Sequence, residues 1–351
     1  MSAKKRVWPT VATLGLAVAM ATAGCASTDK SNSSASANES LGSKAEPSIY
    51  CGSTCQQQLQ LTAAPDSIDC SVGVSWNSAS FPYGAKSTSQ IPEFAKAFFP
   101  KMKVTVSDGR GDATTQADQV ADMVAKGIKV LIISPQDATA LAGAVDRAKA
   151  AGVSVISADR QVATDVSTYI GSDNVEAGLA DGKAVVDALG GKGNVVELSG
   201  SLGASPTIDR AKGFRDGIAG SGIQIVASQT ADYDRATGVK VTEDLLQRFP
   251  KGEIQALYAH NDQMAFGAAQ AIKEQGRTEI KIFSIDGEVN ALQNVKNGSF
   301  AATVGYPLVV KESTLAAAKL CAGEPIDNRI KLDSTLIDAS NVDQYIGKEP
   351  Q

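Results

Sequence analysis

Side chains that can hydrogen-bond a hydroxylated molecule stand directly after three apolar runs of the sequence. The run 153–157 leads into Asp159 and Arg160, and two later runs lead into Asn261 and Asp286. A carboxylate accepts hydrogen bonds from two neighbouring hydroxyls, a guanidinium donates through a fork, and an amide does both. If the fold brings these groups together, they suit a ligand that carries many hydroxyls.

Some of these residues have a simpler explanation as helix N-caps. Asp and Asn accept hydrogen bonds from the unpaired amides of a helix's first turn, and this applies to Asp262 and Asp286. No helix start directly follows Asp159 and Arg160, so a capping role explains that pair less well. The two interpretations place the side chains differently, in a cavity or at a helix end.

Aromatic rings that could cover the apolar C–H face of a sugar occur in similar places. Ser75 and Trp76 end the first predicted strand, Phe81 and Tyr83 follow it, and Tyr233 lies in a later loop. For each ring the alternative is an ordinary core or rim position, because aromatic side chains are commonly buried for packing alone.

Predicted strands and helices alternate along the chain from about residue 71. Residues 130–133 are an unbroken apolar run, as expected for a strand covered by helices on both faces. In the segment 117–124, Ala117, Val120, Ala121 and Val124 have the spacing of one buried helix face. Predicted helices end near Gly127, Gly152, Gly222 and Gly276, each just before a strand, because glycine readily adopts the left-handed conformation that closes a helix.

This alternation predicts an α/β fold of doubly wound parallel sheets. About five or six strands lie on each side of Asp173, which is more than one such sheet comfortably holds, so we expect two lobes in tandem. Ligands of open parallel sheets bind beyond the carboxyl ends of the strands, which is where Asp159, Asn261 and Asp286 stand.

The first residues have the features of an export signal. Lys4, Lys5 and Arg6 precede an apolar run at 11–21, which is too short to span a bilayer, and small residues precede Cys25. The Ala-Gly-Cys sequence resembles the lipobox of bacterial lipoproteins, in which the cysteine becomes a lipid-modified first residue. A departure is Thr22, where the lipobox usually has Leu, and an ordinary secretory signal is the alternative.

These features divide the N-terminal part of the chain into three segments. We expect a lipoprotein signal peptide at 1–24, a flexible polar tether at 25–49 and a Cys-containing extension at 50–69. The chain would then be exported and held by the lipid on Cys25 at the outer face of the cytoplasmic membrane, or lie free in the periplasm.

Charge and cysteine content narrow the possible partners. The full chain of 351 residues has a net charge of −5, which becomes −8 once Lys4, Lys5 and Arg6 leave with the signal. This negative charge argues against nucleic acid as a partner.

Four cysteines remain in an oxidising compartment, Cys51, Cys55, Cys70 and Cys321. Their even number predicts two disulfides, whose pairing the sequence leaves open. A metal site is the alternative, but a single His and the absence of a second Cys-x-x-Cys-type pair argue against one.

Several segments, in the correct order over about 70–340, resemble the ribose-type periplasmic sugar-binding proteins, the solute receptors of bacterial ABC importers. They are 132–135, 156–161, 171–174, 231–235, 260–268 and 285–287. The resemblance implies a periplasmic binding protein type 1 fold with two lobes, a three-segment hinge and flytrap-like closure. Lobe 1 would comprise 70–172 plus 307–335, and lobe 2 would comprise 173–306 plus 336–351, with crossings near 172–173, 304–306 and 336–337.

The same resemblance implies a function and a binding site. A monomeric protein without cofactor would capture a small sugar and deliver it to an ABC permease in the cytoplasmic membrane. Family contacts fall on Asp159, Arg160, Asn261 and Asp286, and Tyr233 occupies an aromatic contact position that is usually Phe. The full expected set is Ser75, Trp76, Phe81, Ser134, Asp159, Arg160, Arg210, Tyr233, Asn261, Asp286 and Tyr306.

Some positions depart from the ribose pattern and leave the identity of the sugar open. Ser134 stands in place of an expected Asn, and Tyr306 in place of an expected Gln. An expected Arg falls on Ile208, although Arg210 follows closely. The extension 50–69 has no counterpart in that family, and we expect a disulfide-pinned strap on lobe 1, with Cys321 as one partner.

Other function classes fit the sequence less well. An enzyme would need more than the single His260, and neither a Gly-x-Ser-x-Gly elbow, a P-loop nor metal-ligand spacing is present. Sugar-responsive repressors share this pair of lobes, but they carry a helix-turn-helix head where this chain has an export signal. A receptor that feeds a sensor or chemotaxis protein is the closer alternative.

Overall fold

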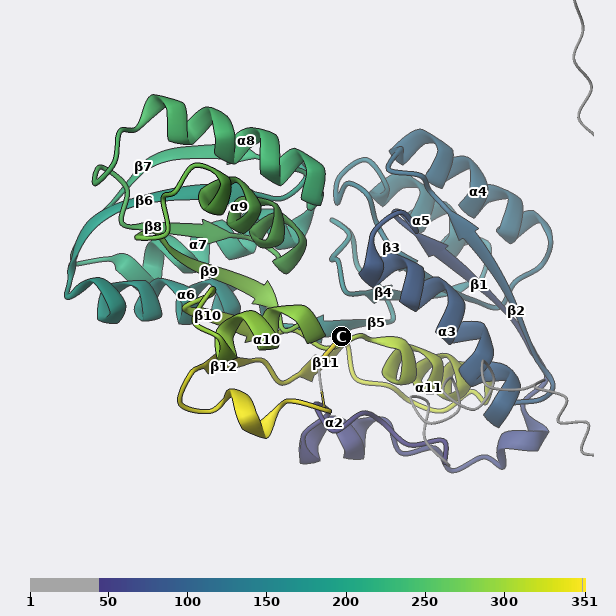
Figure 1. Cartoon of the computed structure of the whole chain (residues 1–351). Helices are drawn as coiled ribbons and strands as arrows, with labels where there is room; N and C mark the ends of the chain where they lie inside the picture. Colours follow the sequence, from purple (N-terminus) through teal and green to yellow (C-terminus); the bar gives the residue numbers. More distant parts are fainter. Residues whose placement is uncertain (1–43, 349) are drawn as a thin grey trace, which may run out of the picture. The chain divides into compact units, whose positions relative to one another are not determined.

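The structure is a computed structural model that describes residues 44–348 and 350–351. The predicted signal peptide 1–24, Cys25 and most of the tether 25–49 lie outside the described residues. In the described part of the chain, no helix combines the length and apolar character needed to cross a bilayer. Residues 70–338 form two α/β lobes, each built around a six-stranded sheet (Figure 1).

The sheet of lobe 1 is entirely parallel, with the strand order β11-β5-β4-β3-β1-β2. Its strands are β1 (Cys70–Trp76), β2 (Met102–Asp108), β3 (Val130–Ser134), β4 (Ser154–Ala158), β5 (Thr168–Ser172) and β11 (Arg329–Leu332). Every residue of β3 is buried, as expected for a strand covered on both faces.

The sheet of lobe 2 has the order β12-β10-β9-β8-β6-β7. Its strands are β6 (Lys192–Ser199), β7 (Gly222–Thr230), β8 (Ala256–Ala259), β9 (Lys281–Asp286), β10 (Ala302–Gly305) and β12 (Thr335–Asp338). The edge strand β12 pairs antiparallel with β10, whereas the other pairs are parallel. The predicted parallel sheet is therefore confirmed for every pair of this sheet except β10 and β12.

Helices cover both faces of each sheet, which makes both lobes doubly wound. In lobe 1, α3 (Pro82–Phe98) and α11 (Val310–Cys321) pack on one face, and α4 (Ala113–Ala125) and α5 (Ala142–Ala150) on the other. In lobe 2, α6 (Asn174–Leu189) and α7 (Ser205–Ile218) face α8 (Arg235–Arg248), α9 (Asp262–Glu274) and α10 (Val289–Lys296) across the sheet. A short helix η2 (Val342–Gln344) follows β12.

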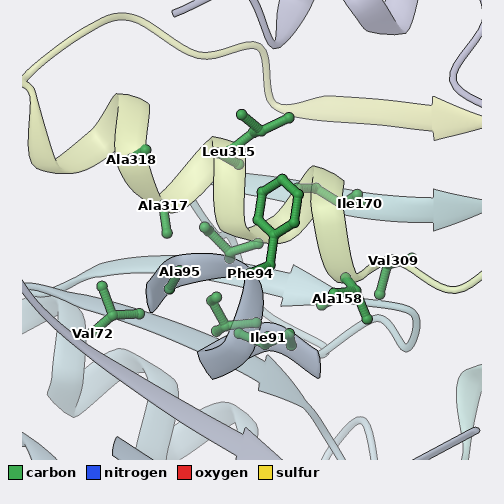
Figure 2. Packing of buried hydrophobic residues seen from close by; sticks show 14 of the residues in the cluster. Val72, Ile91, Phe94, Ala95, Ala158, Ile170, Val309, Leu315, Ala317 and Ala318 are labelled. Carbon is green, nitrogen blue, oxygen red and sulfur yellow. The ribbon is translucent and has the colours of Figure 1, made fainter. Parts of the chain in front are cut away.

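The core of lobe 1 shows how these layers join. Phe94 of α3 is fully buried and lies against α11 near Leu315 and Ala317 (Figure 2). Ile91 of the same helix belongs to this core cluster together with Val72 of β1. Burial of one such side chain stabilises the fold by about 1.5–3 kcal/mol, so these contacts fix α11 on lobe 1 although it follows lobe 2 in the sequence.

The described chain passes between the lobes three times. The first crossing joins β5 to α6 at Asp173, and the second joins β10 to α11 through 306–309. The third joins β11 to β12 through 333–334, so β12 begins at Thr335, a residue that the sequence assigned to lobe 1. The third crossing therefore precedes the predicted position near 336–337.

Two local predictions need correction. In α4, Ala121 is exposed and the buried positions are Gln116, Val120 and Met123, because the helix turns a polar Gln toward the strand ends. Gly127, Gly152 and Gly276 have positive φ after their helices, but Gly222 is already the first residue of β7.

Close packing of α6 on α7 positions the start of α7. A Cβ on Gly178 of α6 would lie 2.2 Å from the carbonyl oxygen of Arg210, and one on Gly213 would lie 2.0 Å from that of Val175. Only glycine allows this approach, since both contacts are with backbone. The pairing of these helices places the Arg210 side chain within reach of Asn174, at the beginning of α6.

Residues 44–69, which we call the strap, lie on lobe 1 and contain α2 (Ser53–Gln58) and η1 (Pro65–Ser67). Cys51, Cys55 and Leu59 are buried in the lobe 1 core. The structure pairs Cys51 with Cys55 at 2.00 Å between sulfurs and Cys70 with Cys321 at 2.01 Å. Cys321, at the end of α11, is thus paired with the first residue of β1. The expected partner for Cys321 was a cysteine of the strap.

Candidate functional site

A cavity of about 60 Å³ lies where the carboxyl ends of the two sheets meet. Side chains from both lobes line it: Trp76, Asn77, Ser78, Phe81, Tyr83, Gly84, Asp159, Arg160, Pro206, Arg210, Tyr233, Asn261, Asp286 and Tyr306. At about 10–15 Å³ for each water that a cavity can hold, this space corresponds to a few waters or one small molecule.

The lobe 1 wall is built on the turn after β4. Asp159 has φ of 64°, and its carbonyl oxygen accepts a hydrogen bond from the Tyr169 hydroxyl at 2.9 Å. The guanidinium of Arg160 donates to the carbonyl oxygens of Pro135 and Gln136 at 3.5 and 3.4 Å. These contacts fix a carboxylate and a guanidinium side by side, with 3.9 Å between Arg160 Nε and Asp159 Oδ2.

The lobe 2 wall combines Arg210 of α7 with the ends of β8 and β9. Arg210 Nε donates to Asn174 Oδ1 at 2.8 Å, and its Nη1 donates to the His260 carbonyl oxygen. Asp286, directly at the end of β9, lies 3.8 Å from Arg210 Nη1. That distance exceeds a hydrogen bond, so both carboxylate oxygens of Asp286 retain acceptor capacity.

Asn261 both caps a helix and lines the cavity, whereas Asp262 and Asp286, for which capping was the alternative, are not N-caps. It is the N-cap of α9, and its Oδ1 accepts from Met264 N at 3.0 Å. Its Nδ2 makes only a 3.5 Å contact with the Tyr233 carbonyl oxygen and faces the cavity. Asp262 is no cap, because it is buried and accepts from Ser284 and from Glu288 N instead.

Backbone strain is concentrated at the cavity. Among the described residues, five non-glycine residues have positive φ, and three of them line this site: Asp159 at 64°, Tyr233 at 60° and Asp286 at 142°. Such conformations cost about 1–3 kcal/mol each and persist where the surroundings hold a side chain for a purpose. All three strained residues direct their side chains toward one space.

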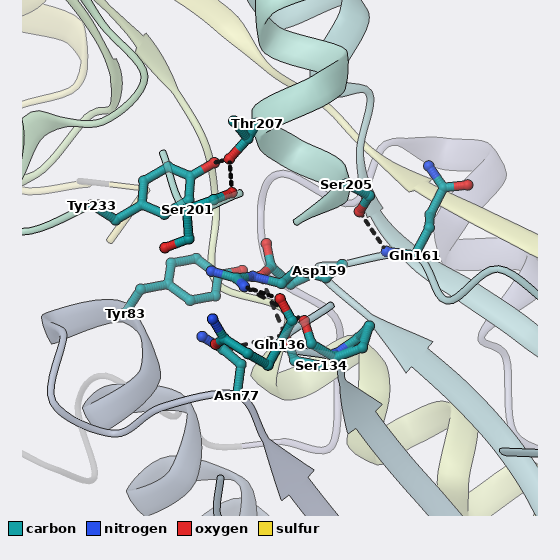
Figure 3. A network of polar contacts seen from close by, with 12 residues as sticks. Asn77, Tyr83, Ser134, Gln136, Asp159, Gln161, Ser201, Ser205, Thr207 and Tyr233 are labelled. Carbon is teal, nitrogen blue, oxygen red and sulfur yellow. Dashed lines mark hydrogen bonds and ion pairs between the residues drawn. The ribbon is translucent and has the colours of Figure 1, made fainter. Parts of the chain in front are cut away.

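The lobes touch across the cavity and around its rim. Tyr306, in the second crossing, donates from its hydroxyl to Asp159 Oδ1 at 3.0 Å and accepts from Asn174 Nδ2 at 3.2 Å. At the rim, Gln161 N donates to Ser205 Oγ at 2.8 Å, as Figure 3 shows. The structure is therefore a closed arrangement of the two lobes.

Burial governs the ionisation of the cavity carboxyls. Loss of water raises the pKa of Asp159 above its ordinary value, against the lowering effect of Arg160 and Arg210. Burial likewise raises the pKa of Asp286 well above its ordinary value, with Arg210 opposing. Burial thus disfavours the charged form of both carboxyls, and an arginine lies beside each of them.

Behind the cavity, His260 is buried and takes part in a hydrogen-bond network with Gly200 and Glu197. Burial lowers its pKa, so the ring is neutral, and its Nδ1 accepts from Gly200 N at 3.3 Å. Its Nε2 therefore carries the proton and donates to Glu197 at 3.1 Å. Glu197 in turn accepts two hydrogen bonds from Arg215, at 3.0 and 2.8 Å.

Most residues of the expected set line this cavity, and two do not. Ser75 and Ser134 lie behind its wall, where Ser75 Oγ contacts Gln116 at 3.3 Å and Ser134 Oγ donates to Asp159 Oδ2 at 3.4 Å. Both are fully buried, because they are the inward residues of central strands. Ile208 is 59% exposed, and Arg210 provides the guanidinium in the cavity.

The cavity also contains residues that sequence reasoning missed. Asn77, Ser78 and Pro206 line it. They were missed because none of them is a charged residue at the end of a predicted strand. A usable signal lay in the pair Asn77-Ser78, two small polar residues immediately after a buried strand.

The described residues contain no cluster of three or more His, Cys, Asp or Glu that could hold a metal ion.

Comparison with known families identifies the fold. The model of the "Periplasmic binding protein domain" family matches residues 72–324, which covers most of both lobes and ends before β11 and β12. The chain belongs to the periplasmic binding protein family. This periplasmic binding protein is therefore a solute-binding protein and not an enzyme, and it acts outside the cytoplasm.

Individual relatives agree with this membership. The chain is 39% identical over 232 residues to the ribose import binding protein of Bacillus subtilis, covering 65% of this chain and 75% of that protein. A solved ABC transporter solute binding protein from Mycobacterium smegmatis, with bound glycerol, superposes with a TM-score of 0.75 at 31% identity, covering 80% of this chain and 98% of that one. The fructose-binding periplasmic domain of a hybrid two-component system has a TM-score of 0.75 at 30% identity, covering 80% and 94%.

Proposed function

We propose that this protein captures a monosaccharide or a similar polyol in the cavity between its lobes and delivers it to an ABC permease in the cytoplasmic membrane. The observation that carries the proposal is the buried Asp286, which lines the cavity and whose carboxylate has no hydrogen-bond donor within normal distance among the described residues. A buried carboxylate without donors is costly, and vicinal sugar hydroxyls supply two donors in the right geometry.

The remaining polar groups complement a polyol. Asp159 Oδ2 and Asn261 Nδ2 have only long contacts, at 3.4 and 3.5 Å, and so keep capacity for a ligand. Arg160 and Arg210 donate toward hydroxyl oxygens. We assign Asp159 and Asp286 as acceptors from opposite lobes, so that only the closed form offers both to one molecule.

Aromatic rings enclose the same space. Trp76, Phe81 and Tyr233 line the cavity, and Arg160 and Arg210 lie 5.6 and 6.0 Å from the centroid of the Tyr233 ring. In our proposal these rings cover the C–H faces of the sugar. Ser75 and Ser134 then have a supporting role, because they hold Gln116 and Asp159 from behind the wall.

Capture works by a shift of population. An open form exchanges solute with the medium, and a ligand that contacts both lobes stabilises the closed form by the contacts that only this form provides. The permease then distinguishes the closed, loaded form from the open one. Closure of the two lobes on a ligand requires only one copy of the chain. We therefore propose that the protein acts as a monomer without cofactor.

A second candidate function is delivery to a sensor in place of a permease. The similarity to a fructose-binding domain from a hybrid two-component system favours it. Neighbouring genes separate the two, since a permease and an ATPase indicate transport and a kinase indicates sensing.

Lipid attachment belongs to the same proposal. We propose that Cys25 carries a lipid and that 25–49 tethers the lobes to the outer face of the membrane, which raises their concentration near the permease. A Cys25→Ser variant should move from the membrane to the soluble fraction, whereas a Ser27→Ala control should stay in the membrane fraction.

We further propose that both cysteine pairs, Cys51 with Cys55 and Cys70 with Cys321, form disulfides, which peptide mapping without reduction would detect.

A thermal-shift screen over pentoses, hexoses, furanose sugars, inositols and short polyols tests the proposed ligand class. A ligand at a hundred times its dissociation constant adds about 2.7 kcal/mol to the stability of the folded protein. We expect one or a few of these compounds to raise the melting temperature and to be recovered chemically unchanged. If no member of the panel raises it, the proposed ligand class is wrong.

A further inference from the structure

The strap and the C-terminal residues meet at the hinge of the molecule. Tyr50 of the strap accepts a hydrogen bond at its carbonyl oxygen from Asp333 N at 2.9 Å, and Asp333 lies in the third crossing. The Tyr50 hydroxyl donates to the carbonyl oxygen of Lys348, which follows η2 of lobe 2. One strap residue therefore contacts both the third crossing and the end of the lobe 2 chain.

The C-terminal residues continue this contact to the second crossing. The carbonyl oxygen of Pro350 accepts from Leu308 N at 3.1 Å, and Gln351 Nε2 donates to the Tyr306 carbonyl oxygen at 2.9 Å. Gln351 is only 9% exposed, so this hydrogen bond is shielded from water. Tyr306 is the same residue whose hydroxyl bonds Asp159 in the cavity.

The strap itself is firmly held on lobe 1. Glu324, just after α11, accepts from Thr62 N, Thr62 Oγ1 and Ala63 N at 2.6–2.9 Å, and the hydrogen bond from the Thr62 hydroxyl is the main cause that lowers the pKa of Glu324 to about 2. Lys319 Nζ donates to the Gln60 carbonyl oxygen at 2.7 Å. Cys51, Cys55 and Leu59 of the strap are themselves buried in the lobe 1 core. The strap is thus a rigid part of lobe 1 and not a loose extension.

From these contacts we propose that Tyr50 and Gln351 form a hinge brace that favours the closed arrangement of the lobes and positions Tyr306 beneath Asp159. Hydrogen bonds of Tyr50 link the strap to the third crossing and to Lys348, and hydrogen bonds of Pro350 and Gln351 link the end of lobe 2 to the second crossing. Opening of the lobes changes the backbone angles of the crossings, so contacts that fit the closed crossings resist it.

The brace should set ligand affinity without touching the ligand. When only a fraction of molecules is closed, the apparent dissociation constant equals the intrinsic value divided by that fraction. Loss of the brace therefore weakens binding and enlarges the ligand-free protein. The affinity effect rests on the proposed function, whereas the change in size does not.

The test compares two brace variants with a matched control. Tyr50→Phe removes only the hydroxyl that reaches Lys348, and Gln351→Ala removes the amide that reaches Tyr306. Thr62→Val is the control, because it removes a strap hydroxyl that contacts only lobe 1. Each variant is made in the full chain, and its melting temperature shows whether it is folded.

Two measurements decide the outcome. Small-angle scattering without sugar should show a larger radius of gyration for Tyr50→Phe and Gln351→Ala than for the unaltered protein and Thr62→Val. Calorimetry with D-ribose, or with the panel sugar that gives the largest thermal shift, should show a dissociation constant at least about threefold higher in the brace variants alone.

The inference is overturned if the radius of gyration of the brace variants equals that of the control, or if all three variants weaken binding equally. A protein that binds no sugar of the panel would contradict the proposed ligand class, and the scattering comparison would still decide whether the brace exists.

Discussion

The hydroxyl of Tyr306 donates to Asp159 Oδ1 across the junction of the two lobes, at 3.0 Å. Because the hydroxyl has a single proton, this bond to Asp159 uses it. The hydroxyl oxygen also accepts a hydrogen bond from Asn174 Nδ2 at 3.2 Å. Asp159 Oδ1 is therefore bound within the protein, whereas Asp159 Oδ2 has only the 3.4 Å contact from Ser134 Oγ. A ligand would meet half of this carboxylate, together with the whole of Asp286.

Replacing Asp159 should weaken sugar binding more than it weakens the fold. Asp159→Asn keeps the size of the side chain but exchanges an acceptor oxygen for an NH₂ donor. A lost hydrogen bond to a charged group costs about 1.5–3 kcal/mol, so we expect the dissociation constant to rise about 10- to 100-fold in calorimetry. Unchanged affinity would remove Asp159 from the site.

Removing the Tyr306 hydroxyl should loosen the contact between the lobes. Tyr306→Phe keeps the ring, whose centroid lies 4.6 Å from the Arg210 guanidinium, but leaves Asn174 Nδ2 without an acceptor. We expect a loss of about 1–3 kcal/mol in the free energy of unfolding. Tyr233→Phe is the matched control, since its hydroxyl contacts only Thr207 of the same lobe. Equal radii of gyration for the two ligand-free variants would contradict the role of Tyr306 as a contact between lobes.

Sugar binding should release protons. Burial raises the pKa of Asp286 well above its ordinary value in the empty cavity and so favours its protonated form. Hydroxyls that donate to this carboxylate favour its ionised form and lower the pKa, so affinity should rise with pH until Asp286 is ionised in the free protein. Calorimetry in buffers of different ionisation enthalpy measures the proton number, and proton uptake on binding would contradict this assignment.

The network behind the cavity predicts a specific sensitivity to acid. Burial alone would raise the pKa of Glu197, but hydrogen bonds from His260 and Arg215 outweigh it and lower the pKa to about 2. A depressed folded-state pKa contributes stability above the unfolded value, near 4.5, that is lost as the pH falls toward 2.

For Glu197 this contribution is about 3 kcal/mol. Unfolding by urea between pH 7 and pH 2.5 should therefore show a smaller acid-dependent loss in Glu197→Gln than in the unaltered protein. Parallel pH curves for the two proteins would contradict the prediction.

Much of this fold could be predicted from its sequence because helix and strand periodicity is local. The unbroken run 130–133 predicted a central buried strand, and β3 is buried throughout. The antiparallel edge strand β12 was missed, since its direction depends on how the chain returns across the hinge after residue 332. No local pattern records such a return.

The site was predictable where chemistry follows a strand end, and not where it depends on packing. Asp159, Asn261 and Asp286 were selected from the sequence because charged or amide residues interrupt apolar runs, and all three line the cavity. Ser134 was placed in the site by resemblance, yet the pleat of β3 turns it behind the wall. The hinge contact of Tyr50 joins residues 298 positions apart, which no spacing in the sequence indicates.

Fluorescence of Trp76 tests the central claim most directly. Trp76 and Trp8 are the two tryptophans of the chain, and a protein produced from residue 26 onward contains only Trp76, which lines the cavity. We predict a saturable change in its emission when a sugar of the panel is added, and no such change at the same concentrations in Asp286→Ala. Emission that stays constant with every sugar, or an equal affinity in Asp286→Ala, would contradict a sugar site between the lobes.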